Sequence, residues 1–91
     1  MALAFHFSPT GFTPKEYDDV IVRLEAAGAG APVGRLHHVA MVTDGQIHVF
    51  DVWDSQESFE AFGKTLLPIM ADVGADPGEP TVAAVHNIIE G

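Results

Sequence analysis

The sequence contains no cysteine, so disulfide bridges and thiolate metal sites are excluded. Basic residues are also scarce: four stand against 13 acidic ones, and the formal net charge is −9 at pH 7. Because phosphate binding needs a clustered basic surface, we expect no nucleic-acid partner. The chain has no apolar run near the roughly 18 residues that a membrane-spanning helix needs, and no basic segment typical of a secretion signal. These features predict a cytoplasmic protein with no membrane partner.

Several catalytic motifs are missing as well. The chain lacks a dinucleotide-binding G-x-G-x-x-G, a phosphate-binding P-loop, a G-x-S-x-G nucleophile elbow and an H-E-x-x-H metal motif. We therefore expect no dinucleotide, nucleoside triphosphate or serine-nucleophile chemistry. What the chain does have is hydrophobic residues, which make up 47% of its 91 residues. A domain of this size cannot easily bury so much apolar surface alone, so we expect one domain over residues 1–91 that pairs with a second copy.

Hydrophobic periodicity predicts six elements in the order strand, helix, strand, strand, helix, strand. The expected ranges are 2–7, 13–28, 35–43, 46–53, 55–74 and 81–89. This order predicts a ferredoxin-like α+β fold, with a four-stranded antiparallel sheet and two helices on one face. Both faces of the expected strands carry many apolar side chains, and a homodimer would cover the face without helices.

Capping residues mark the starts of both helices. Thr13 followed by Glu16 predicts a capping box at the first helix, and Asp54 followed by Glu57 predicts another at the second. Pro68 lies inside the second helical segment, where we expect a kink or a break because proline has no N–H to donate.

The dipeptide Asp44-Gly45 predicts a two-residue hairpin turn. With this turn, His38 lies directly opposite Asp51, and both side chains point to the same face of the sheet. Asp51 is otherwise an anomaly, since a carboxylate inside the apolar stretch "VFDVW" needs a partner. A histidine–aspartate pair can hold one imidazole tautomer and transfer protons to or from a ligand. The alternative is that the two groups only satisfy each other in a half-buried sheet.

The same register places Leu36 opposite Trp53. Trp53 is either a core residue or an aromatic platform for a ligand, and Tyr17 on the first helix either packs in the core or directs its hydroxyl to a pocket. Phe59 begins the apolar face of the second helix and is a further candidate for ligand contact.

His6 and His86 lie on the first and last expected strands, which neighbour each other in this topology. Either histidine would approach His38 and Asp51 if its side chain pointed to the same face. Two histidines and one carboxylate would then form a metal triad. The spacing does not fix this arrangement, and we expect no bound metal.

The stretch "VWDSQESFEAF" at residues 52–62 carries a family resemblance. Together with the element order, it resembles the dimeric α+β barrel proteins, and most closely their antibiotic-biosynthesis-monooxygenase-like group, over nearly the whole chain. The resemblance implies that two sheets close into a barrel across a dimer. It also implies a ligand cavity between sheet and helices of each subunit, lined by the residue that matches Trp53.

The chain departs from two patterns in this superfamily. Gly63 stands where haem-degrading members carry an iron-ligating histidine, and Val49 stands where cofactor-free monooxygenases carry an asparagine. We therefore do not expect haem breakdown, and we expect no bound cofactor. The hypothesis is a cofactor-independent monooxygenase or an isomerase/cyclase that acts on a small apolar or aromatic molecule. The alternative is a non-catalytic ligand-binding or structural dimer.

Overall fold

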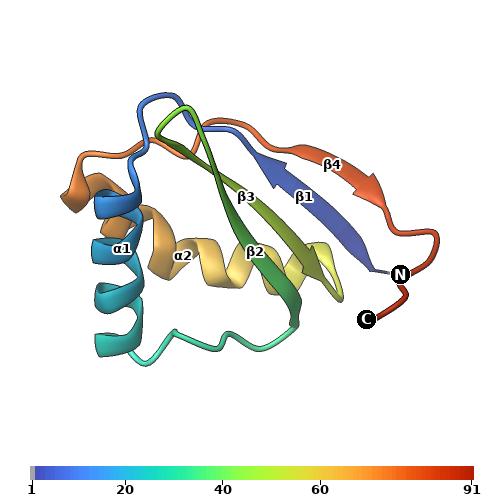
Figure 1. Cartoon of the computed structure of the whole chain (residues 1–91). Helices are drawn as coiled ribbons and strands as arrows, with labels where there is room; N and C mark the ends of the chain where they lie inside the picture. Colours follow the sequence, from blue (N-terminus) through green and yellow to red (C-terminus); the bar gives the residue numbers. More distant parts are fainter. Residues whose placement is uncertain (1) are drawn as a thin grey trace.

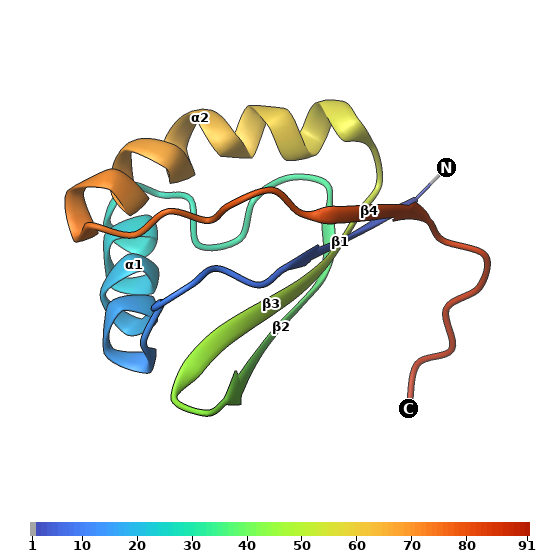
Figure 2. The same ribbon diagram turned by 90° about the horizontal axis from the view of Figure 1, so that it is seen from above.

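The computed structural model describes residues 2–91 and contains one antiparallel sheet with the strand order β2-β3-β1-β4. Both helices cover the same face of this sheet (Figure 1, Figure 2). The elements are β1 (Leu3–Phe7), α1 (Pro14–Ala26), β2 (Arg35–Thr43), β3 (Gln46–Trp53), α2 (Gln56–Val73) and β4 (Thr81–Ala84). The predicted ferredoxin-like α+β fold is confirmed. In residues 2–91, no helix is long and apolar enough to span a membrane.

The start of α1 has the predicted capping box. The Thr13 hydroxyl accepts a hydrogen bond from the Glu16 backbone N–H at 3.2 Å, and the Glu16 carboxylate accepts one from the Thr13 N–H at 3.0 Å. Two N–H groups that a helix start leaves without partners are thereby satisfied. This fixes the first turn of α1, which carries Tyr17 toward the sheet.

The start of α2 differs from the prediction. Its N-cap is Ser55, whose hydroxyl accepts from the Ser58 N–H at 3.1 Å, so the box expected from Asp54 does not form. The helix also continues through Pro68 to Val73 without a break, although its second half changes direction (Figure 2).

The β2–β3 hairpin turns at Asp44 and Gly45, both with positive φ, as a type I′ turn requires. From this turn the predicted register holds as far as His37, which lies opposite Val52, and it places His38 opposite Asp51. The partner that the turn geometry predicts for Asp51 is confirmed.

Beyond His37 the register shifts by a β-bulge. Arg35, and not Leu36, lies opposite Trp53, because the bulge adds one residue to β2. Gly34 precedes the bulge with φ +91°, and a Cβ there would lie 2.4 Å from the Ser58 hydroxyl oxygen. Close packing against α2 therefore requires a glycine and sets the path by which β2 enters the sheet.

Strand β4 is shorter than predicted, since it ends at Ala84 and not near residue 89. The Val85 N–H still donates to the Ala2 carbonyl, and the chain then leaves the sheet (Figure 2). The end of this tail returns to the sheet face without helices, where His37 Nε2 lies 3.0 Å from the Glu90 carboxylate.

The core lies between the sheet and the two helices. Its buried side chains come from β1, α1, β3, α2 and the loop before α1, and they are Phe5, Phe12, Val20, Leu24, Ile47, Trp53, Phe62 and Met70. In residues 2–91, Asp51 is the only buried polar or charged residue, with 6% of its surface exposed. The opposite face of the sheet carries Val39, Met41 and Phe50, which are 48%, 40% and 38% exposed. We call this the helix-free face.

Candidate active site

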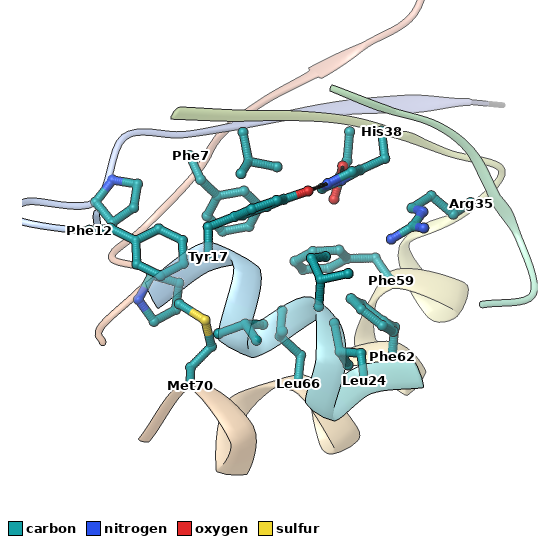
Figure 3. Close-up of a pocket in the computed structure, with 16 residues that line it drawn as sticks. Phe7, Phe12, Tyr17, Leu24, Arg35, His38, Phe59, Phe62, Leu66 and Met70 are labelled. Carbon is teal, nitrogen blue, oxygen red and sulfur yellow. Dashed lines mark hydrogen bonds and ion pairs between the residues drawn. The ribbon is translucent and has the colours of Figure 1, made fainter. Parts of the chain in front are cut away.

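A cavity of about 70 Å³ lies between the sheet and the two helices (Figure 3). A single buried water needs about 10–15 Å³ by the same measure, so the cavity has room for more than a water molecule. Most of its wall is apolar or aromatic, with side chains that include Phe7, Phe12, Leu24, Phe59, Phe62, Leu66 and Met70. Its polar lining residues are Tyr17, Arg35, His38 and Asp51. An apolar cavity with a few converging polar groups is typical of a small-molecule site.

Three of these polar residues form a hydrogen-bonded chain. Asp51 Oδ1 lies 2.5 Å from His38 Nδ1, and His38 Nε2 lies 2.6 Å from the Tyr17 hydroxyl. The tyrosine and imidazole rings are inclined by only 6°, so the phenol meets the histidine end to end in the plane of its ring (Figure 3). The chain runs from a buried carboxylate on β3, through β2, to a phenol on α1.

The protonation of this chain follows from the environment of Tyr17. Burial raises the pKa of the Tyr17 phenol above its ordinary value of 10.0; Asp51 and Asp18 raise it further, while the Arg35 guanidinium opposes the shift. At neutral pH the phenol therefore keeps its proton and can donate it to His38 Nε2. In the tautomer that fits this contact, the imidazole carries its own proton on Nδ1 and donates it to Asp51.

This arrangement can accept and return a proton. When Tyr17 passes its proton to His38, the imidazolium that forms is stabilised by the Asp51 carboxylate, and the phenolic oxygen can take a proton from a ligand. Tyr17, one of the candidate residues predicted from the sequence, is thus the member of the chain that lies next to His38 on the helix side.

Arg35 is a lining residue that the sequence reasoning missed. An uninterrupted hairpin register would place its side chain on the other face, and the bulge at Leu36 brings it to the face of His38. Figure 3 shows its guanidinium directed into the space near His38 and Phe59. The glycine before it was the only local signal of an irregular strand start.

Trp53 and Phe59, both predicted as ligand contacts, occupy different positions. Phe59 lines the cavity and stacks on Phe5, with 4.1 Å between the ring centroids. Trp53 is completely buried beside Phe59 and Phe62, and it does not line the cavity. This position does not support the expected stacking of Trp53 on a ligand.

His6 and His86 do not approach His38 and Asp51. His6 lies next to buried Phe5 in β1, so alternation directs it to the helix-free face. His86 follows the early end of β4 and lines a hollow on that same face with the C-terminal tail. The two-histidine, one-carboxylate alternative is therefore wrong. Within residues 2–91 there is no cluster of three or more metal-ligating side chains.

Solved structures with this fold come from several bacteria. SnoaB, a cofactor-independent oxygenase from Streptomyces nogalater, is 17% identical with a TM-score of 0.62, and the match covers 99% of this chain and 96% of SnoaB. A protein of Chloroflexus aurantiacus assigned to the antibiotic biosynthesis monooxygenases is 22% identical over 98% of this chain and 95% of its own, with a TM-score of 0.62. A protein of Deinococcus radiodurans with the same assignment is 10% identical over 99% and 97% of the two chains, with a TM-score of 0.61.

These similarities confirm, at the level of the fold, the resemblance predicted from the sequence. The chain has the ferredoxin-like fold of the antibiotic-biosynthesis-monooxygenase-like proteins. No protein-family model and no curated protein matches its sequence.

Proposed function

We propose that the protein is a cofactor-independent enzyme that removes a proton from a small apolar or aromatic molecule bound between the sheet and the helices. The observation that carries this proposal is the hydrogen-bonded chain from Asp51 through His38 to Tyr17, at the wall of an otherwise apolar cavity. A buried carboxylate is costly unless it is paired, and this one is paired with a residue that leads toward the cavity.

In the proposed step, the Tyr17 oxygen takes a proton from the ligand while the Tyr17 proton moves to His38 Nε2. The products are the ligand anion, a neutral phenol and an imidazolium held by the Asp51 carboxylate. Return of the proton to another ligand atom gives an isomerisation or accompanies a cyclisation. Addition of molecular oxygen to the anion gives an oxygenation, and the fold shared with a cofactor-independent oxygenase supports this second outcome.

The proposal is tested by proton exchange, which needs no knowledge of the natural substrate. We expect the protein to catalyse exchange of the acidic C–H protons of phenylacetone or phenylpyruvate with deuterated water, followed by nuclear magnetic resonance. The substitution His38→Gln should reduce the catalysed rate to the buffer rate, because the amide cannot accept the relayed proton. Asp51→Asn should reduce it too, because an imidazolium would lose its charged partner.

The matched control is His48→Gln. His48 points to the helix-free face of the sheet, where its ring lies 3.1 Å from the Ser8 hydroxyl. Its substitution should leave the exchange rate unchanged. Absence of catalysed exchange with both probes in the wild-type protein would contradict the proposal. It would instead favour a non-catalytic ligand-binding dimer, in which the pair of His38 and Asp51 only stabilises the sheet.

We also propose that the protein is a homodimer joined through the helix-free face. The exposed side chains of Val39, Met41 and Phe50 support this, because contiguous apolar surface on a small protein marks an interaction site. Ile88 and Ile89 of the C-terminal tail extend the apolar surface beside this face. Sedimentation of the purified protein at several concentrations tests the proposal, and a monomer at all concentrations would contradict it.

A further inference from the structure

Arg35 provides the cationic side chain of the cavity wall. The chain has only four lysine and arginine residues, and Arg35 is the one of them that lines this cavity. The acidic lining residue, Asp51, is already bonded to His38, and Arg35 forms no ion pair with an acidic side chain of residues 2–91. A guanidinium without an acidic partner, beside an apolar cavity, can bind an anionic group of a ligand.

The Arg35 guanidinium contacts the protein on one side and has free N–H donors on the side of the cavity. One of its Nη2 protons is donated to the Gly30 carbonyl at 3.2 Å, and its Cζ lies 5.9 Å from the centre of the Phe62 ring. A guanidinium has five N–H donors, and in residues 2–91 the Gly30 carbonyl is its one protein acceptor. The remaining donors are available to a ligand or to water at the cavity (Figure 3).

The backbone conformation around Leu36 and Gly34 determines the direction of the Arg35 side chain. The bulge at Leu36 turns Arg35 to the cavity side, and Gly34 allows the close approach to Ser58 that precedes the bulge. Arg35 also acts electrostatically on Tyr17, since its charge opposes the rise in the pKa of that phenol. An anion bound to Arg35 would therefore lie near the proposed proton-transfer group.

We propose that the ligand is a small aromatic carboxylate, with the carboxylate bound by Arg35 and the ring held among the phenylalanines of the cavity wall. The planar fork of a guanidinium matches both oxygens of a carboxylate, which a lysine ammonium cannot do. This inference rests on the proposed function, because it assigns the substrate class of the same cavity.

Benzoate and benzamide test this inference, because they have the same shape and differ in charge. In a titration followed by nuclear magnetic resonance, wild-type protein should bind benzoate at least about tenfold more tightly than benzamide. Arg35→Met, which keeps an apolar stem over Phe62, should remove this preference. Arg35→Lys should keep part of it, because the charge remains and the fork is lost.

The matched control is Arg23→Met. Arg23 lies on α1 and pairs with Asp19 at 3.3 Å on the surface, so its loss changes the net charge by the same amount away from the cavity. The preference for benzoate should survive in this variant.

Equal affinities of the wild-type protein for the two probes, or a preference that survives in Arg35→Met, would overturn the inference. If the protein still catalyses exchange of phenylacetone, only the substrate class is wrong. If neither probe binds and no exchange is catalysed, the proposed function fails as well.

Discussion

The two faces of the sheet differ in what they leave unsatisfied. Neighbouring residues of β3 show the contrast, since Asp51 points toward the helices and is 6% exposed, whereas Phe50 points away from them and is 38% exposed. On the helix side a charged group is buried and bonded to His38. On the helix-free face apolar side chains are exposed to solvent.

This difference is consistent with two kinds of binding site, one for a small molecule and one for another protein chain. A paired carboxylate beside an apolar cavity is suited to proton transfer with a small bound molecule. Exposed Val39, Met41 and Phe50 form a broader apolar surface, which is typical of a site of association. The proposed chemistry therefore lies on one face of the sheet and the proposed association on the other.

Of the two faces, the helix side should give the larger effect, on removal of the Tyr17 phenol. Tyr17→Phe deletes the group that meets His38 and should lower the catalysed exchange of phenylacetone about 100-fold, within the range for general acid–base groups. The free energy of unfolding should fall by only about 1 kcal/mol, the usual net value of one hydrogen bond. An unchanged exchange rate would show that Tyr17 is not in the proton path.

Two substitutions of Asp51 distinguish the loss of its charge from the loss of its hydrogen-bond acceptor. Asp51→Leu leaves His38 Nδ1–H without its acceptor and should lower the free energy of unfolding by about 1–3 kcal/mol. Asp51→Asn keeps an oxygen at this position and should cost less. Urea unfolding followed by the fluorescence of Trp53, the single tryptophan, measures both. Equal stability of the two variants would contradict a buried donor–acceptor pair.

The helix-free face is probed by Phe50→Glu. A charge in the middle of the proposed interface should weaken self-association at least about tenfold, measured by sedimentation. The control is Val22→Glu, because Val22 is an exposed apolar residue on α1, away from this face. If both variants associate like the wild-type protein, the interface lies elsewhere.

The smallest effect is the titration of Tyr17, which is the single tyrosine and can be followed by ultraviolet absorbance. Its pKa in the folded protein should exceed 10.0, and in urea it should return to that value. Because the folded pKa is the higher one, the contribution of Tyr17 to stability is present below pH 10.0 and is lost as the pH rises above it. A folded pKa at or below the unfolded one would contradict the burial of this phenol.

Local signals predicted the fold and one half of the site. The Asp44-Gly45 turn fixes the register of its hairpin, and this register alone identified His38 as the partner of Asp51. The helix periodicity placed Tyr17 on the buried stripe of α1. Its contact with His38 depends on how α1 lies on the sheet, which the spacing of residues within the helix does not specify.

The errors arose where distant segments decide the local structure. Arg35 reaches the cavity through a bulge that accompanies the packing of Gly34 against Ser58. No residue pattern between positions 35 and 43 predicts this bulge. His86 lies outside the site because β4 ends at Ala84, although the apolar pattern continues beyond that residue.

The most direct test of the account is the protonation of the His38 ring. Nitrogen-15 nuclear magnetic resonance of the histidine side chains at neutral pH, with the His38 signals assigned by their absence in His38→Gln, distinguishes the two ring nitrogens. We predict a proton on Nδ1, donated to Asp51, and none on Nε2, which accepts from Tyr17. The Nε2 signal should shift in Tyr17→Phe and stay unchanged in His48→Gln. A neutral His38 with its proton on Nε2 would contradict the proposed chain from Asp51 to Tyr17.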